Sequence, residues 1–126
     1  MQGCSPTRPS SCTSGPAVSA LAFYAGVLGM PVDPDRPDLG FPGAWLKIGE
    51  DQQIHLLELP NPDPTSDRPA HGGRDRHVAL RIDDIEPLRA ALDAAGVDYT
   101  LSRSGRRALF CRDPDGNALE FIQSEG

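Results

Sequence analysis

The pattern of apolar and polar residues changes from a helical period to a strand period along the first half of the chain. Between residues 16 and 29, apolar residues recur at the spacing of an amphipathic helix, with proline at its start and glycine at its end. This stripe consists of Val18, Leu21, Ala25 and Leu28. Four prolines between residues 31 and 42 restrict strands there to short edge pieces. We predict strands at residues 44–48 and 52–59, joined by a turn.

A second series of elements follows residues 60–75, a polar segment rich in proline and glycine that we interpret as a connecting loop. Alternation predicts a strand at residues 76–82. Asp83 or Asp84 can then cap a helix that Gly96 ends. The apolar stripe of this helix consists of Ile85, Leu88, Leu92 and Ala95. Three more strands are predicted, at residues 97–101, 107–112 and 117–123.

The two halves repeat the same order of elements, which points to an internal duplication. The corresponding pairs are Gly29 and Gly96, 67 positions apart, Trp45 and Phe110, 65 apart, and His55 and Glu120, 65 apart. We therefore predict an α+β fold. Two βαβββ modules would form curved mixed sheets around a cleft, with the helices outside.

The domain organisation follows from length and local composition. Residues 1–16 are rich in proline, serine, threonine and glycine, which is typical of a disordered tail. A chain of 126 residues is too short for two independent domains. We predict one domain at residues 17–126, with module one at 17–59, the loop at 60–75 and module two at 76–123.

Charge and cysteine content exclude several classes of protein. A net charge of −6 argues against nucleic acid as a partner, because phosphate recognition needs an excess of lysine and arginine. The three cysteines cannot all pair and lack the spacing of a zinc knuckle, so we expect free thiols and a buried Cys111. No apolar run is long enough to span a membrane or to form a signal peptide. We therefore expect a cytoplasmic protein.

Three residues in predicted strands form a candidate metal site: His55, His77 and Glu120. Alternation places them on the strand faces opposite the apolar residues expected to pack on the helices, namely Ile54, Leu56, Val78, Leu80, Leu119 and Phe121. Two imidazoles and one carboxylate suit a divalent transition metal. Taken singly, His77 could equally have a structural or surface role, whereas a carboxylate flanked by apolar residues needs a partner.

Other polar and aromatic residues have an ordinary structural explanation beside a functional one. We expect His71, in the connecting loop, to be exposed to solvent. Arg103, Arg106 and Arg107 surround a predicted hairpin turn, where they could clamp an anionic substrate group or form a solvated basic turn. Trp45 could line a pocket or pack in the core. We retain Arg103, Arg107 and Trp45 as candidate substrate-binding residues.

Four segments of the chain carry a family resemblance. They are LAFYAGVLGMPV (21–32), IHLLEL (54–59), GGRDRHVALRIDDI (72–85) and RALFCRDPDGNALEF (107–121). Together they resemble the vicinal-oxygen-chelate proteins, also called the glyoxalase/bleomycin-resistance/dioxygenase group, over about residues 17–124. The resemblance implies that Glu120 is the terminal glutamate ligand, that His77 is the ligand opening the second module, and that His55 matches a ligand of the first.

The resemblance also implies a first strand and a fourth ligand near Pro9, where the chain has no histidine, glutamate or glutamine. Three explanations are open. The metal could be held by three residues and water, the N-terminus could reflect a shifted reading frame, or the metal site could have been lost.

The activity implied by the resemblance is divalent-metal-dependent chemistry on a small oxygenated molecule. A glyoxalase-like lyase or isomerase would use zinc, nickel, iron or manganese, with Glu120 shuttling a proton. Two alternatives are an iron-dependent ring-cleaving dioxygenase and a metal-free binding or resistance protein. We expect a small-molecule substrate and a homodimer, since similar proteins commonly dimerise.

Overall fold

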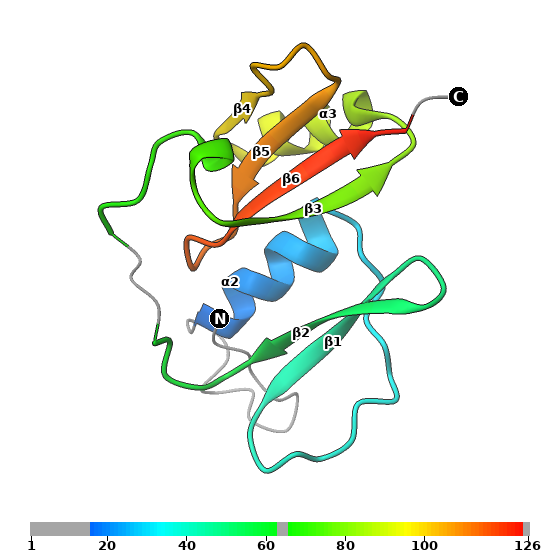
Figure 1. Ribbon diagram of the computed structural model, residues 1–126. Coiled ribbons are helices and arrows are strands. Elements are labelled where there is room, and N and C mark those ends of the chain that lie inside the picture. Colours follow the sequence, from blue (N-terminus) through cyan, green and yellow to red (C-terminus); the bar gives the residue numbers. More distant parts are fainter. Residues whose placement is uncertain (1–15, 63–65, 125–126) are drawn as a thin grey trace. The chain divides into compact units, whose positions relative to one another are not determined.

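The computed structural model describes residues 16–62 and 66–124, shown in Figure 1. The chain divides into two compact units, Met1–Asp63 and Pro64–Gly126, which we describe one at a time. The predicted disordered tail and the degenerate first strand near Pro9 fall outside the described residues. Within the described part, no helix combines the length and apolar character needed to cross a membrane.

The first unit begins with the predicted helix. An α-helix at Pro16–Leu21 (α2) continues as a π-helix at Ala22–Val27 (η1). The wider turn of η1 is marked by the amide of Leu28, which donates to the carbonyl of Phe23 over 2.9 Å. Gly29 has a φ of 74°, so it ends the helix in the conformation that glycine adopts most readily.

The strands described in the first unit form an antiparallel hairpin of β1, Gly43–Ile48, and β2, Gln52–Leu57, and Val32 adds an isolated bridge to Leu46. Ala44, Leu46 and Leu56 lie on one face and are buried. Trp45 and His55 are direct partners on the opposite face. The predicted strands are therefore confirmed, although β2 ends two residues before the predicted end at residue 59.

The second unit contains the complete βαβββ order. Its elements are β3 at His77–Ile82, α3 at Ile85–Ala95, β4 at Tyr99–Leu101, β5 at Ala108–Arg112 and β6 at Ala118–Gln123. The strand order is β3-β6-β5-β4, with β3 parallel to β6 and the other pairs antiparallel. The sheet is mixed, and the α+β class is confirmed. As predicted, the Asp84 side chain caps α3 by accepting from the amide of Glu86, and Gly96 ends the helix with a φ of 69°.

The helix α3 packs on one face of this sheet and contacts β6. Leu80, Leu109 and Phe121 are buried on that face, as the alternation predicts. Val78 corrects the prediction, because it was expected to pack on the helix and is 55% exposed. The reason is that β3 is an edge strand, whereas α3 lies over the interior strand β6.

The burial pattern of the second sheet leads to a stability prediction. Leu109 is fully buried, so Leu109→Ala removes apolar contacts and leaves a cavity, lowering the free energy of unfolding by about 2–5 kcal/mol. The control Leu101→Ala lies on the neighbouring strand, where the side chain is 46% exposed, and should lower it by less than about 1 kcal/mol. Urea denaturation measures both. Equal losses would contradict the placement of the core.

Candidate functional site

The face of the second sheet opposite α3 contains a buried carboxylate, Glu120. This residue lies on the interior strand β6, between Ala79 of β3 and Phe110 of β5. Its neighbours on both sides leave the side chain only 5% exposed. A buried carboxylate requires partners that replace water, so the groups around it define the site.

Two cationic or ionisable groups contact the two oxygens of Glu120. His77 Nε2 lies 3.2 Å from Oε1, and Arg106 Nη2 donates to Oε2 over 3.1 Å. His77 opens β3, and Arg106 lies two residues before the start of β5. The structure therefore brings together two of the three predicted metal ligands, His77 and Glu120. It adds Arg106 as a contact that the sequence named only as part of a basic turn.

The orientation of His77 is fixed by its second nitrogen. Nδ1 lies 2.8 Å from the backbone carbonyl oxygen of Asp75, and a carbonyl can only accept, so Nδ1 carries the proton. Nε2 is thereby turned toward the carboxylate of Glu120. A ring nitrogen and a carboxylate oxygen that face each other need a cation between them, either a proton or a metal ion. The same arrangement, with one nitrogen bound to a carbonyl, is common for histidines that bind metals.

The carboxylate of Asp75 belongs to a partly buried ionic cluster that the sequence did not reveal. Oδ2 accepts from Arg68 Nε over 2.7 Å and from Arg112 Nη1 over 2.9 Å. Hydrogen bonding to Arg68, and then to Arg112, lowers the pKa of Asp75 to about 2 despite the opposing effect of burial. The predicted connecting loop is thus held firmly to β5, and no local pattern indicates this contact across 37 residues.

His71 corrects a second prediction, because it was expected to be exposed and is only 9% exposed. Its Nδ1 lies 2.6 Å from Thr100 Oγ1, and its ring meets Phe110 edge to face at 4.8 Å. The two glycines that follow allow this approach, since a Cβ on Gly72 would lie 3.2 Å from Phe110 Cβ. Burial lowers the pKa of His71, and the charge of Arg103 lowers it further.

The third predicted ligand, His55, lies in the first unit. Its ring stacks on Trp45 with a centroid distance of 4.3 Å, and Nε2 lies 2.9 Å from Gln53 Oε1. The Gln53 amide nitrogen donates to Asp33 Oδ2 over 2.7 Å, which leaves its oxygen to accept from His55 Nε2. Nδ1 of His55 therefore retains the lone pair that a metal would need. Trp45 Nε1 is buried and has no hydrogen-bond partner.

Neighbouring arginines are directed to opposite faces of the second sheet. Arg106 is an even number of residues from Phe110, so it points to the same face and reaches Glu120. Arg107 points to the α3 side and donates to Glu86 Oε2 over 3.1 Å. A hollow of about 550 Å³ lies beside them. Its lining consists of Arg81, Gly105, Arg106, Arg107, Ile122, Gln123 and Ser124.

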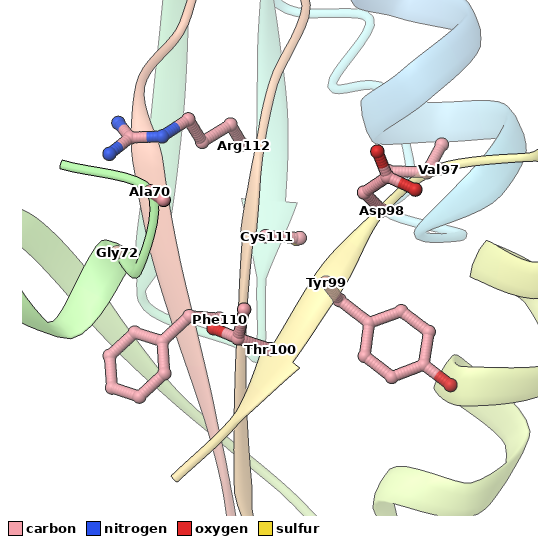
Figure 2. A pocket seen from close by; sticks show the side chains of 9 residues that line it. All are labelled: Ala70, Gly72, Val97, Asp98, Tyr99, Thr100, Phe110, Cys111 and Arg112. Atoms are coloured by element: carbon pink, nitrogen blue, oxygen red, sulfur yellow. The ribbon is translucent and has the colours of Figure 1, made fainter. Parts of the chain in front are cut away.

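A smaller hollow of about 250 Å³ lies along β4 and β5. Figure 2 shows Phe110 and Arg112 on one side of β5 and Cys111 and Tyr99 on the other. Burial, followed by the charge of Asp113, raises the pKa of Cys111 to about 12. The buried thiol predicted from the sequence is confirmed, and its high pKa argues against a role as nucleophile.

The three predicted ligands, two imidazoles and one carboxylate, are groups that commonly bind divalent metals. The second unit supplies His77 Nε2 and the carboxylate of Glu120, and the first unit supplies His55. Among the residues that the structure describes, no three histidine, cysteine, aspartate or glutamate side chains come together in a group that could hold a metal ion.

Comparisons with known proteins agree on one family. The model for the Glyoxalase/Bleomycin resistance protein/Dioxygenase superfamily matches residues 17–121. Glyoxylase I 4 from Arabidopsis thaliana is 33% identical over 112 residues, covering 84% of this chain, which spans only 63% of that relative. Lactoylglutathione lyase from Haemophilus influenzae is 28% identical over 113 residues, covering 84% of this chain and 83% of the lyase.

A solved structure shows the same fold. The crystal structure of a protein from Bacillus anthracis, described as belonging to the glyoxalase family, superposes with a TM-score of 0.69 at 26% identity. The match covers 86% of this chain and 84% of that one.

The lowered pKa of His71 gives a pH prediction. The ring of His71 has a lower pKa in the folded state than its ordinary value of 6.5. Just below pH 6.5, this ring therefore binds a proton more readily in the unfolded state than in the folded state. The stabilising contribution of neutral His71 is thus present above pH 6.5 and is lost as pH falls through the lower folded-state value. The difference in stability between the wild type and His71→Gln should shrink over that range in urea denaturation.

A direct measurement is the NMR titration of the histidine rings. His71 should titrate below 6.5, and Arg103→Gln should move its midpoint upward by removing a nearby positive charge. A midpoint at or above 6.5 in the wild type would contradict the buried, cation-flanked environment.

Proposed function

The chain belongs to the Glyoxalase/Bleomycin resistance protein/Dioxygenase superfamily, and within it we propose a divalent-metal-dependent enzyme that acts on a small oxygenated molecule. The reaction would be of the glyoxalase-like lyase or isomerase kind. The observation that carries this proposal is the pair of His77 and Glu120. Nδ1 of the histidine is bound to a carbonyl, and Nε2 faces a buried carboxylate.

The metal ligands in this proposal are His55, His77 and Glu120. Superfamily members are typically dependent on a divalent metal. Two neutral imidazoles and one carboxylate suit zinc, nickel, iron or manganese, with water completing the shell. The absence of a histidine, glutamate or glutamine near Pro9 leaves room for one more water or for a substrate oxygen.

The chemistry divides between the metal and the protein. When bound, a divalent ion polarises neighbouring substrate oxygens and stabilises the negative charge that develops on them. Glu120 would accept a proton from a carbon beside these oxygens and return it to the neighbouring carbon. Arg106, which donates to Oε2, holds the carboxylate in one orientation, and the burial of Glu120 keeps bulk water from the transferred proton.

The substrate in this proposal carries a negative charge. The hollow of about 550 Å³ is lined in part by Arg81, Arg106 and Arg107, and Arg106 also contacts Glu120. Planar guanidinium groups bind carboxylate or phosphate in a bidentate manner. The prediction that Arg103 and Trp45 also contact the substrate stays a prediction.

A second candidate is a metal-free protein that binds a small molecule at the same face. The observation that favours it is the ion pair between Arg106 and Glu120, which by itself neutralises the buried carboxylate. In this alternative, His77 and Arg106 are the permanent partners of Glu120, and no metal is needed to satisfy it.

Metal content distinguishes the two candidates. Protein purified without chelators or a histidine tag should contain close to one divalent ion per chain, and the metal should be lost in His77→Ala and Glu120→Ala. The control Glu86→Gln changes an exposed carboxylate on α3 and should retain the metal. Elemental analysis and Co²⁺ absorption spectra measure these changes. A wild type that takes up no divalent ion under any loading condition would overturn the enzyme proposal.

Arg106 provides a further prediction with a matched control. Its guanidinium competes with a metal for Glu120, so Arg106→Gln should tighten Co²⁺ binding roughly twofold to fivefold, as expected for a partly exposed ion pair. Arg107→Gln removes the neighbouring arginine on the opposite face and should leave the affinity unchanged. Loss of folding stability in Arg106→Gln without any Co²⁺ binding would favour the metal-free protein.

A further inference from the structure

Asp75, which lies two residues before β3 and accepts from His77, has a hydrogen-bond partner at each of its polar atoms. The amide of Asp75 donates to the Gly72 carbonyl over 3.1 Å. Its Oδ1 accepts from the Arg76 amide over 2.8 Å, and Oδ2 accepts from two arginines. Its carbonyl oxygen lies 2.8 Å from His77 Nδ1. Residue 75 therefore has little freedom to turn its carbonyl away from the imidazole.

Arg112 is the group that ties this residue to the sheet. Its Nη1 donates to Asp75 Oδ2 over 2.9 Å and to the Gly116 carbonyl over 2.8 Å, and its Nη2 donates to the Pro69 carbonyl over 2.6 Å. One planar guanidinium thus joins β5, the turn before β6 and two points of the segment before β3. A lysine at this position could not reproduce these directions with a single ammonium group.

Arg68 completes the cluster from within the segment before β3. Its Nε donates to Asp75 Oδ2 over 2.7 Å, and the side chains of both residues are largely buried, at 15% and 11% exposed. Charged groups that lose most of their hydration need hydrogen bonds from fixed protein groups, so Arg68 and Asp75 hold each other in one orientation. The carboxylate of Asp75 is consequently held from both sides.

From these contacts we propose that Asp75, held by Arg68 and Arg112, is a positioning residue for His77. The carboxylate fixes residue 75, the carbonyl of residue 75 fixes Nδ1, and Nε2 is thereby presented to Glu120. The role of His77 as a metal ligand rests on the function proposed above, whereas the orientation of its ring does not. Arg68, Asp75 and Arg112 act through His77 and need not touch a substrate.

A purely structural role for the cluster makes a different prediction. If the three residues only held the segment to the sheet, weakening them would lower the stability of the fold and leave the His77 hydrogen bond unchanged in the molecules that remain folded. If they position the ring, the hydrogen bond from Nδ1 to the carbonyl weakens in the folded state. Exchange of the Nδ1 proton with solvent separates these two roles.

The test uses Asp75→Asn and Arg112→Lys in the full chain, with Asp67→Asn as the matched control. Asp67 is an exposed aspartate of the same segment with a φ of 59°, a conformation that asparagine also tolerates. NMR of the metal-free proteins, well below their unfolding temperatures, measures the exchange of the His77 Nδ1 proton. Backbone amides of β6 serve as the reference for global opening.

We expect the Nδ1 proton to exchange at least tenfold faster in Asp75→Asn and Arg112→Lys than in the wild type and Asp67→Asn, with the β6 amides still protected. Co²⁺ affinity should fall about 10- to 100-fold in the same two variants. Unchanged Nδ1 exchange in folded Asp75→Asn and Arg112→Lys would overturn the positioning role. If the wild type binds no Co²⁺, the proposed function fails, and the exchange rates still decide the positioning role.

Discussion

The burial of Glu120 is the constraint on which the rest of the site depends. An ionised carboxylate on an interior strand must be matched by hydrogen bonds and positive charge, because water cannot reach it. His77 at the start of β3 and Arg106 in the segment between β4 and β5 provide this match. Removing either partner would leave the remaining groups unsatisfied, so the contacts form one unit. The candidate chemistry and the stability of this face therefore have the same physical origin.

The topology explains why these partners converge. In the order β3-β6-β5-β4, the strand that carries Glu120 has a parallel neighbour on one side and an antiparallel neighbour on the other. Phe110 is its direct partner on β5, just as Trp45 is the direct partner of His55 in the first unit. The 65-residue offset seen in the sequence thus relates the two cross-strand pairs. Each unit presents an aromatic ring beside one candidate ligand.

Local pattern predicted the strands, the regular helices, their caps and the faces of the strand side chains, because these depend on residues a few positions apart. It did not predict the π-helical turns at Ala22–Val27 or the 3-10 helix at Gly72–Arg74. It also separates Arg106 from Arg107 once the start of β5 is known, since successive residues of an extended chain point to opposite faces. It could not predict the burial of His71 or the tie between Arg112 and Asp75. Both depend on how an irregular segment folds against a strand about 30 or more residues away, which has no periodic signal.

The electrostatics of the second unit differ from those of the chain as a whole. The protein carries a net charge of −6, yet the pKa of the buried His71 is lowered by burial and then by Arg103 and Arg74. Burial is the larger cause, and the smaller effects of Arg103 and Arg74 indicate a positive contribution to the electrostatic potential near His71, whose ring contacts Phe110 as the ring of His77 does. Such a potential attracts an anionic substrate and opposes a bare divalent cation. A metal could be held there only by an anionic ligand, and Glu120 is the buried carboxylate that this face provides. In the proposed enzyme, the same residue would thus allow a cation to bind beside an anionic substrate.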